Sequence, residues 1–573
     1  MALPSAPDLS RLSLFEGLAP EVLDEIAPTL NAWVVPGGET LFAEGEPADA
    51  VYVVLSGAFI ASKGQPPAAP RVVGTIAAGE TIGEMALLSG RPRSATVRAL
   101  RDSEVLGFTR EEFERLLKRH PHAMLGLARV AYRRLELAMA QSSRPRLPRA
   151  IAIVPGGEGV DPWAFAEALQ QSLARFGRVV VLGERECRTW VSGQYHALES
   201  AGATLLYVAE QMNSPWSSLC RRQSDTVLVL AVAADTPAEQ PGTQLDPFKP
   251  LRLVLLHRGN LRPGRARAWL KAFGQVPLHH VRDSEDIARI ARLLTGHATA
   301  LVLSGGGARG FAHLGVVQAL REAGLEIDAI GATSIGAVMG AGVASEWGDL
   351  ELYAAYKRSF VDTNPLSDYT FPFVSLVAGR KASKLLQREF GDTDIEDLPI
   401  PFFCISANLT AGKVHVHDRG PLWRALRASI AIPGVLPPVF EGGQVLVDGG
   451  VIDNLPIDVM RERHAGRIIG VDIAGEHALK TNVEEANLPS LWRMVWEHVS
   501  GRANRPGIVS ILLRSGMVNS ATTTLLNRAQ SSLLISPPVT EIDLMDWRAF
   551  DRAIRIGYQH AHALLANLPV GWR

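Results

Sequence analysis

The chain has 573 residues, which predicts three or four domains at about 100–200 residues per domain. Lysine and arginine together number 58 and aspartate and glutamate 59, so the formal net charge is −1. This balance disfavours nucleic acid as the main partner, because a phosphate backbone requires a cationic surface. Hydrophobic residues make up 47% of the chain, which excludes disorder on a large scale.

Membrane-spanning and secreted proteins are disfavoured as well. The longest unbroken apolar run, residues 227–234, is much shorter than the roughly 20 residues that a spanning helix requires. Residues 1–18 lack the basic start and apolar stretch of a secretory signal. The three cysteines, Cys187, Cys220 and Cys404, form no CxxC pair, which favours a reducing compartment and disfavours disulfides and a zinc site. We therefore expect a cytoplasmic protein that contacts a membrane only peripherally, at its inner face.

The first part of the chain has the pattern of a small β-roll. Over residues 12–130, short alternating segments such as residues 50–55 and 72–76 lie between turns rich in glycine and proline. A helical pattern follows over residues 110–139. The polar, proline-containing segment 142–148 predicts a linker.

The middle of the chain, residues 149–297, alternates strand-like and helical patterns, which predicts a parallel sheet covered by helices. The expected elements are strands at residues 151–154, 179–182, 226–231 and 251–256, and helices at residues 162–175 and 286–294. Because no GxxxxGK[ST] loop is present, we interpret this part as a structural or regulatory spacer. From residue 298 the α/β alternation continues, and roughly the last hundred residues are mainly helical in pattern.

A glycine-rich loop follows the first strand of the C-terminal part. Residues 299–304 predict a buried strand that runs into Gly305-Gly306-Gly307-Ala308-Arg309-Gly310 and then into a helical run at residues 311–323. This order has the GxGxxG form of a dinucleotide-binding fold. Asp328, however, opens the second strand, whereas a ribose-binding acid stands at the far end of that strand. A dinucleotide oxidoreductase is therefore disfavoured.

A serine stands at the far end of the second strand. Ser334 lies among small residues at a strand-to-helix corner, an arrangement that exposes a nucleophilic Oγ above a parallel sheet. Adjacent parallel strands end at the same edge, so the backbone N–H groups of Gly305, Gly306 and Gly307 can face a developing oxyanion. Arg309 adds positive charge there and could also hold a phosphate. Either motif alone is commonly a turn or a helix cap, but both of them one strand apart favour catalysis.

A hydrolytic serine needs a base. His313, His415 and His417 keep a triad conceivable, but none of them has the small-residue loop expected at a catalytic position. Asp448 is the better candidate, because it ends an apolar strand and is followed by two glycines that let the backbone turn away. Its carboxylate is then expected at a strand tip.

These residues resemble the patatin-like phospholipases, which use a Ser–Asp dyad without histidine. The matching segments are residues 305–310, Ser334, residues 422–438, Asp448-Gly449-Gly450 and Asn454-Leu455-Pro456. The resemblance covers residues 298–475, and residues 151–296 look similar to the middle region of the neuropathy target esterase branch. One position departs from the family's GxSxG elbow, because Ala332 occupies the place of the first glycine.

The resemblance implies an α/β hydrolase-type three-layer catalytic domain. In it, Ser334 is the nucleophile and Asp448 the base. The implied oxyanion hole consists of Gly305, Gly306, Gly307 and Arg309. The implied reaction is hydrolysis of the carboxylic ester of a lysophospholipid or phospholipid through an acyl-serine, without a metal or a catalytic cofactor. The apolar residues 369–377 and 432–440 line an acyl channel, touch a bilayer or belong to the core.

A second motif lies in the N-terminal part, at residues 83–97. Gly83 and Glu84 open a short helical turn whose N–H groups can meet a phosphate, and Arg93 can add a charge-assisted hydrogen bond to it. Glu84 is then free to accept from a ribose hydroxyl. This string resembles the phosphate-binding cassette of cyclic-nucleotide-binding domains, and Ser94 stands where the bacterial catabolite activator also has serine, which favours cAMP.

The sequence thus predicts a multidomain chain: an N-terminal cyclic-nucleotide-binding β-roll with helices, a middle α/β parallel-sheet domain and a C-terminal patatin-like domain. The expected limits are residues 12–138, 149–297 and 298–475, with a mainly helical C-terminal extension at 476–573. The expected function is a serine esterase acting on lysophospholipids or phospholipids at a membrane surface, regulated by cAMP or another cyclic nucleotide. The alternatives are a catalytically weak or inactive, cyclic-nucleotide-responsive scaffold at the membrane, and a catabolite-activator-like regulator. The latter is disfavoured because α/β patterning follows the sensor.

Overall fold

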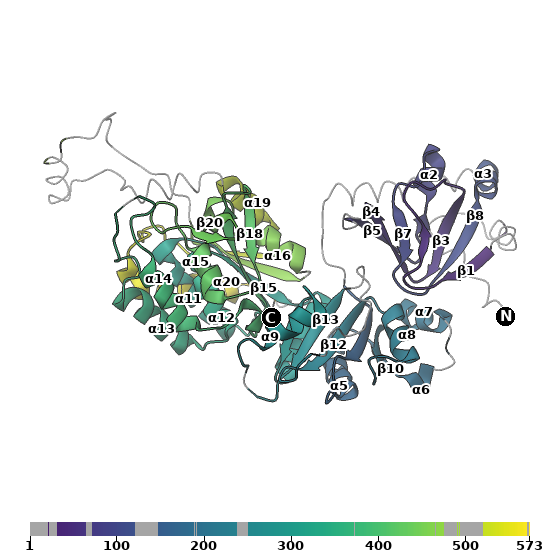
Figure 1. Ribbon diagram of the computed structural model, residues 1–573, viewed down its shortest axis with the longest axis horizontal. Helices are drawn as coiled ribbons and strands as arrows, with labels where there is room; N and C mark the ends of the chain where they lie inside the picture. The colour runs from purple at the N-terminus through teal and green to yellow at the C-terminus, as the bar shows by residue number, and fades with distance from the viewer. Residues whose placement is uncertain are drawn as a thin grey trace. The chain divides into compact units, whose positions relative to one another are not determined.

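The computed structural model describes residues 31–64, 71–120, 147–187, 192–237, 250–259, 261–371, 373–464, 466–474 and 520–569, with the single residues 21, 190, 490, 492 and 572 (Figure 1). The chain divides into two compact units. The first consists of Met1–Asn260 and Ala268–Thr295, and the second of Leu261–Arg267 and Gly296–Arg573. Of the helices in these described ranges, none combines the length and apolarity needed to cross a bilayer.

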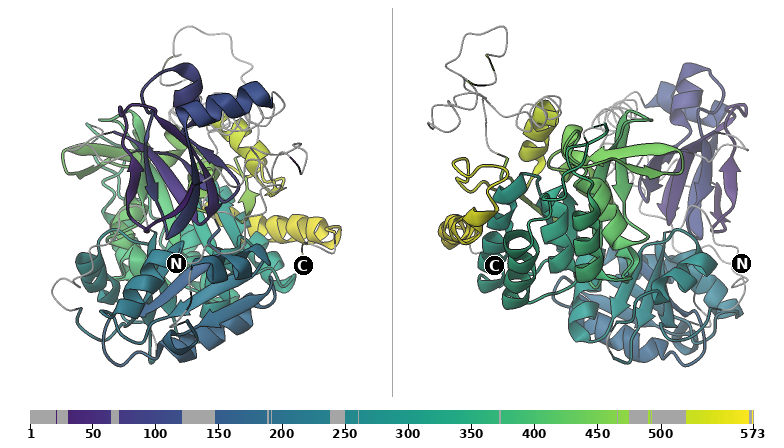
Figure 2. Two further views of the ribbon diagram at one scale, coloured as in Figure 1. Left: turned by 90° about the vertical axis from the view of Figure 1, so that its right-hand side faces the viewer. Right: turned by 60° about the vertical axis from the view of Figure 1, so that its left-hand side comes forward.

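The first unit begins with the expected β-roll, built from two antiparallel four-stranded sheets (Figure 1; Figure 2, left). One sheet has the order β1 (Asn31–Val35), β8 (Ser103–Thr109), β3 (Ala50–Ser56) and β6 (Thr81–Ile82). The other has the order β2 (Thr40–Phe42), β7 (Thr96–Ala99), β4 (Ala58–Lys63) and β5 (Arg71–Ala77). Alternate side chains of both sheets, including Val54, Phe59 and Val105, form one buried core.

Two helices accompany the roll. The short helix α2 (Glu84–Ser89) connects β6 to β7, and α3 (Arg110–Arg119) follows β8. The helical pattern expected up to residue 139 and most of the linker expected at residues 142–148 lie outside the described residues.

The first unit continues with a six-stranded parallel sheet, as expected for the middle part of the chain. Its order is β10 (Val179–Leu182), β11 (Thr204–Val208), β9 (Ala150–Pro155), β12 (Thr226–Val232), β13 (Leu251–Leu256) and β14 (Leu278–Val281). The accompanying helices are α5 (Pro162–Leu173), α6 (Glu184–Cys187), α7 (Ser192–Ser200), α8 (Pro215–Gln223), α9 (Arg265–Phe273) and α10 (Ser284–Thr295). The longest apolar run of the sequence forms β12, which is buried at every position because strands flank it on both sides and helices cover it. The four predicted strands are present, whereas β11 and β14 were not predicted.

The second unit contains an eight-stranded mixed sheet. Its order is β19 (Val439–Glu441), β20 (Gln444–Asp448), β17 (Phe402–Asn408), β16 (Ala329–Thr333), β15 (Thr299–Leu303), β21 (Arg467–Val471) and β22 (Leu533–Ile535), with β18 (Lys413–His417) paired to β17. The strands from β17 to β22 along this order run parallel to one another. By contrast, β20 and β18 run antiparallel to β17.

Helices cover both faces of this sheet. They are α11 (Ala312–Glu322), α12 (Ile335–Ala344), α13 (Asp349–Tyr356), α14 (Arg380–Phe390), α15 (Leu422–Ser429), α16 (Ile457–Arg463), α19 (Ser520–Gln530) and α20 (Phe550–Ala566). Alternate residues of β15 show the layering: Leu301 and Leu303 pack into a core with α11, α12 and α20, whereas Ala300 and Val302 pack on the opposite face with α16. This three-layer arrangement confirms the predicted fold class (Figure 1).

The C-terminal segment does more than the expected helical covering. Its described residues form α19 and α20, but between these helices β22 adds an edge strand beside β21. Helix α20 packs along α11, so the last helix belongs to the same core as the first strand of the unit.

Candidate active site

Ser334 stands on a sharp turn between β16 and α12. Its backbone has φ 55° and ψ −129°, a strained conformation that a side chain rarely adopts outside functional turns. The helix after it approaches the neighbouring strand closely at Gly336, where a Cβ atom would lie 2.6 Å from the carbonyl oxygen of Ser304. The turn therefore holds the Ser334 hydroxyl above the carboxyl end of the parallel sheet, as the sequence predicted.

Asp448 reaches Ser334 from the antiparallel side of the sheet. It ends β20, whose pairing with β17 places it opposite Ser406. The Ser334 hydroxyl donates to Asp448 Oδ2 at 2.6 Å, and the backbone N–H of Gly450 donates to Oδ1 at 2.8 Å. Burial raises the pKa of the Asp448 carboxyl to about 6, against the lowering effect of these two hydrogen bonds. The carboxylate is thus a stronger base than an exposed aspartate.

Two polar residues that the sequence did not single out support this pair. The backbone N–H of Ser334 donates to Ser429 Oγ at 2.9 Å, and that hydroxyl donates to the carbonyl of Ile405 at 2.7 Å. Asn454 Nδ2 donates to the carbonyl of Gly305 at 3.2 Å. Both lie in segments that matched the patatin-like pattern, but nothing local indicated which of their residues faces the serine.

The glycines of the loop have different roles. Gly305 donates its N–H to the carbonyl of Asn454 at 3.3 Å, so it is not the free donor that we expected. It allows close approach instead, because a Cβ atom there would lie 2.9 Å from Ser334 Cβ. The N–H groups of Gly306 and Gly307 have no acceptor among the described residues, and Gly307 lines the same pocket as Ser334. These two remain the donors available to an oxyanion.

The expectation for Arg309 was wrong. Its guanidinium is buried and donates to three backbone carbonyls, those of Ile542 at 2.8 Å, Ala474 at 2.9 Å and Thr540 at 3.3 Å. All three belong to segments far along the chain, so the side chain fastens the C-terminal segment to the sheet. Its charge is engaged there and not at the oxyanion.

The alternative bases and the dinucleotide reading have structural explanations. His313 contacts the carbonyl of Ser304, and His417 contacts the hydroxyl of Ser406; burial lowers the pKa of both imidazoles. His415 packs its ring against that of His417. Asp328 Oδ2 accepts from the backbone N–H of Thr299 at 2.9 Å, at the strand end opposite to the serine.

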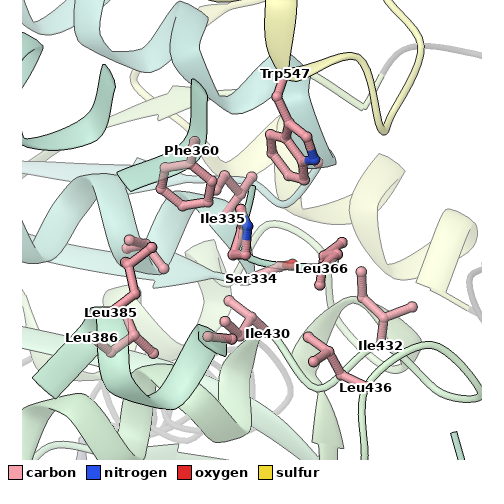
Figure 3. Close-up of a pocket in the computed structure, with 14 residues that line it drawn as sticks. Ser334, Ile335, Phe360, Leu366, Leu385, Leu386, Ile430, Ile432, Leu436 and Trp547 are labelled. Atoms are coloured by element: carbon pink, nitrogen blue, oxygen red, sulfur yellow. The ribbon is translucent and has the colours of Figure 1, made fainter. Parts of the chain in front are cut away.

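An apolar pocket opens above Ser334 (Figure 3). It is narrow, about 50 Å³, and its wall consists almost wholly of aliphatic and aromatic side chains. The residues labelled around Ser334 are Ile335, Phe360, Leu366, Leu385, Leu386, Ile430, Ile432, Leu436 and Trp547. Of the two apolar stretches expected to line a channel, residues 432–440 contribute Ile432 and Leu436, whereas the side chains of Tyr369, Phe371 and Phe373 are exposed. The pocket suits a hydrocarbon chain.

The residues of the N-terminal cassette lie together. Gly83 precedes α2 with φ 87°, and the buried Arg93 donates to its carbonyl at 3.3 Å and to that of Ala50 at 2.8 Å. Arg93 Nε is buried without a partner among the described residues, which fits an anion beside it. Glu84 is buried and Ser94 is exposed.

Three family profiles match this chain. The patatin-like phospholipase profile matches residues 301–461, the cyclic nucleotide-binding domain profile residues 33–120, and the profile of the P-loop like domain of the neuropathy target esterase (NTE) family residues 148–292. An uncharacterized NTE family protein of Mycobacterium bovis is 33% identical over 98% of this chain and 96% of its own length. The chain belongs to the NTE family. The resemblances seen in the sequence are thereby confirmed.

Longer relatives of this NTE-family protein carry more specific names. Lysophospholipase NTE1 of Candida albicans is 29% identical over 93% of this chain and 46% of its own length. Patatin-like phospholipase domain-containing protein 6 of Pongo abelii is 28% identical over 94% of this chain and 44% of its own length. The chain thus spans less than half of these relatives. The matches confirm the predicted enzyme class, a carboxylic ester hydrolase with a patatin-like phospholipase domain.

The P-loop like domain of this NTE-family protein does not fit a nucleotide phosphate. The loop after β9, residues 156–161, has no lysine, and Asp161 occupies the end of α5 by accepting the N–H groups of Trp163 and Ala164. A cavity of about 450 Å³ beside it is lined by three glutamates, Glu184, Glu186 and Glu210. These carboxylates oppose a polyphosphate, so we assign no nucleotide chemistry to this domain.

Proposed function

We propose that this protein hydrolyses the carboxylic ester of lysophospholipids or phospholipids with a Ser334–Asp448 dyad. The observation that supports it most is the 2.6 Å hydrogen bond between Ser334 Oγ and Asp448 Oδ2 at the floor of an apolar pocket. A nucleophile, a base and a binding site for a hydrocarbon chain then meet at one sheet edge.

The proposed reaction has two steps. Asp448 takes the proton of the Ser334 hydroxyl while Oγ attacks the ester carbonyl, and the N–H groups of Gly306 and Gly307 stabilise the oxyanion. The tetrahedral intermediate collapses to acyl-Ser334, and Asp448 returns the proton to the departing alkoxide. In the second step Asp448 deprotonates a water molecule that attacks the acyl carbonyl. The fatty acid leaves, and the proton returns to Ser334.

The wider setting is also a proposal. The apolar pocket and the absence of a described spanning helix support an enzyme that meets its lipid at the surface of a membrane, from the cytoplasm. We propose domain limits at residues 12–138, 149–297 and 298–475, with residues 476–573 as an extension of the catalytic domain to which β22 contributes.

The test is hydrolysis of lysophosphatidylcholine by the purified full chain, measured as fatty-acid release, with Ser334→Ala as the control for background. In parallel, the protein is treated with a fluorophosphonate and the modified peptide is identified by mass spectrometry. We expect release by the wild type alone and a single adduct on Ser334. Release without an adduct on Ser334 contradicts the dyad. An adduct without release contradicts the substrate class. Neither result favours the catalytically inactive scaffold.

We further propose that the N-terminal domain binds a cyclic nucleotide, cAMP in the first instance, and thereby changes the rate of hydrolysis. The match of residues 33–120 to the cyclic nucleotide-binding profile supports the ligand class, and the unpartnered Arg93 Nε supports a phosphate contact. In this proposal Glu84 accepts from the ribose hydroxyl and Ser94 contacts the phosphate. Regulation requires that the ligand bind two states of the enzyme with different affinity.

Replacing Arg93 by glutamine is expected to weaken cAMP binding by roughly 10- to 150-fold, because a charge-assisted hydrogen bond to phosphate contributes about 1.5–3 kcal/mol. Titration calorimetry with cAMP and cGMP measures the loss. Arg91→Gln is the matched control, since Arg91 is exposed two residues earlier in the same segment. Equal affinity of both variants for cAMP contradicts the phosphate contact. An unchanged hydrolysis rate of the wild type at saturating cAMP contradicts regulation.

A further inference from the structure

A second pocket of the catalytic unit is basic. It has a volume of about 460 Å³ and lies between the start of α14, α15 and the segment after α15. Four cationic side chains line it, Arg380, Lys384, Arg424 and Arg427. We call this the basic pocket. Among these four, the printed ion pair is that of Arg424 with Glu441, at 3.5 Å. Positive charge therefore exceeds negative charge at its wall.

Arg427 forms the inner end of the basic pocket. Its side chain is buried, with 5% of its surface exposed. Nη2 donates to the carbonyl of Pro437 at 2.9 Å, but Nη1 is buried without a partner among the described residues. Asp368 is close enough to act on its charge, yet the two side chains form no ion pair. A buried guanidinium with an unused donor is costly unless an acceptor completes it.

Helix α14 separates the basic pocket from the catalytic serine. Its residues Leu385 and Leu386 line the pocket of Ser334, whereas Arg380 and Lys384 line the basic pocket. The helix begins after Gly379, whose φ is 73°, without a side chain that caps it, so its first N–H groups add partial positive charge on this side. The basic pocket is thus distinct from the site of ester cleavage, although one helix lines both.

Exposed apolar side chains flank the basic pocket. Tyr369, Phe371, Phe373 and Val374, which we call the aromatic loop, are 81%, 72%, 87% and 62% exposed. The N–H of Ala378 donates to the carbonyl of Asp368 at 2.8 Å, which closes this loop directly before the pocket residue Gly379. Phe440, 65% exposed, follows the pocket residue Val439. Aromatic residues beside cations are typical of protein surfaces at a lipid interface.

We propose that the basic pocket binds the head-group phosphate of an anionic phospholipid while the aromatic loop enters the interface beside it. The charge of the four cations, the unused donor of Arg427 and the exposed aromatic side chains are together complementary to such a lipid. The contact holds the catalytic unit on the surface from which, under the function proposed above, it takes its substrate. This inference rests on that function only for its purpose, not for the binding itself.

The test is sedimentation of the full chain with vesicles of phosphatidylcholine alone and of phosphatidylcholine mixed with phosphatidylglycerol. The variant is Arg380→Gln with Lys384→Gln, because both side chains are exposed and their loss does not disturb the core. The matched control is Arg388→Gln with Arg552→Gln, which removes the same charge from exposed ion pairs of this unit with Glu389 and Glu541. Hydrolysis of a short-chain, water-soluble ester in the same samples reports on the dyad independently.

We expect wild type and control to bind the anionic vesicles more tightly than the neutral ones, and the variant to lose about 30-fold in affinity for the anionic vesicles, at about fivefold per cation. Phe371→Ser with Phe373→Ser is expected to weaken binding to both kinds of vesicle. Equal binding of variant and control overturns the proposal, as does equal binding of the wild type to both vesicles. Displacement of the wild type from anionic vesicles by soluble glycerol 3-phosphate at micromolar concentration assigns the pocket to a free phosphate ester and also overturns it. A wild type that binds anionic vesicles but cleaves no ester refutes the proposed function alone.

Discussion

Asp448→Asn is expected to lower kcat for ester hydrolysis by roughly a hundredfold to ten-thousandfold, the range that a positioned general base contributes. An amide at this position can still accept from the N–H of Gly450, but it cannot take the proton of the Ser334 hydroxyl. Combining it with Ser334→Ala is expected to add almost nothing, because the two residues act as one unit. Fatty-acid release by the two single variants and the double variant measures this, and additive losses contradict a shared step.

The same substitution is expected to raise stability at neutral pH. Burial raises the pKa of Asp448 to about 6 in the folded protein, from an ordinary value of 3.8. Between these values the folded state holds a proton that the unfolded state has released, so stability falls as pH rises through this window. Above about pH 6 the ionised carboxylate costs up to about 3 kcal/mol, which asparagine avoids. Calorimetry is expected to show a higher Tm for Asp448→Asn at pH 7 and little difference near pH 4. A lower Tm at pH 7 contradicts this account.

The pH dependence of the wild type follows from the same group. Only the ionised carboxylate accepts a proton, so kcat/KM is expected to fall about tenfold per pH unit below about pH 6 and to level off above it. A profile of lysophosphatidylcholine hydrolysis between pH 4.5 and 8 at constant ionic strength measures the limb (a range of about two pKa units around the midpoint). A limb near pH 4 would mean that the base is a solvated carboxylate and not the buried Asp448.

The sequence indicated Ser334 and Asp448 because each follows an apolar strand and precedes small residues. That pattern is local, so it survives without knowledge of the rest of the fold. The role of Arg309 depends instead on carbonyls of Thr540 and Ile542, more than 230 positions away in the chain, and no local pattern states where a long side chain ends. Ser429 was invisible for the same reason, since its hydroxyl acts on the nucleophile through a helix end that only tertiary packing brings there.

The strands show the same division. Strands β10 and β13 carry uninterrupted apolar runs and were predicted with the bounds that the structure has. Strand β22 has three residues, and β14 contains two histidines, so their patterns are too short or too polar to indicate a strand. Both form because a neighbouring strand offers an open edge, which the sequence of the segment itself does not contain.

Gly336→Ala is expected to destabilise the catalytic unit and to lower kcat/KM by about a hundredfold. In an ordinary helix, alanine is more favourable than glycine by about 1 kcal/mol. Here its Cβ would lie 2.6 Å from the carbonyl oxygen of Ser304 and 2.7 Å from that of Leu303, and backbone atoms of a central strand cannot yield easily. The start of α12 must move, at a cost of about 1–3 kcal/mol, and Ser334 moves with it; a displacement of about 1 Å is enough for a loss of this size.

Gly340→Ala is the matched control, because it lies in the same helix and its nearest neighbours are the ends of side chains, the closest being Ile330 Cγ2 at 3.1 Å. We expect it to keep both stability and activity, since a side chain can shift by a few tenths of an ångström where a carbonyl cannot. Thermal unfolding and lysophosphatidylcholine hydrolysis of the two variants separate the explanations. Equal effects would mean that α12 tolerates no added methyl group anywhere. A harmless Gly336→Ala would mean that the turn at Ser334 is not held by this close approach, and that the strained backbone of the serine has another cause.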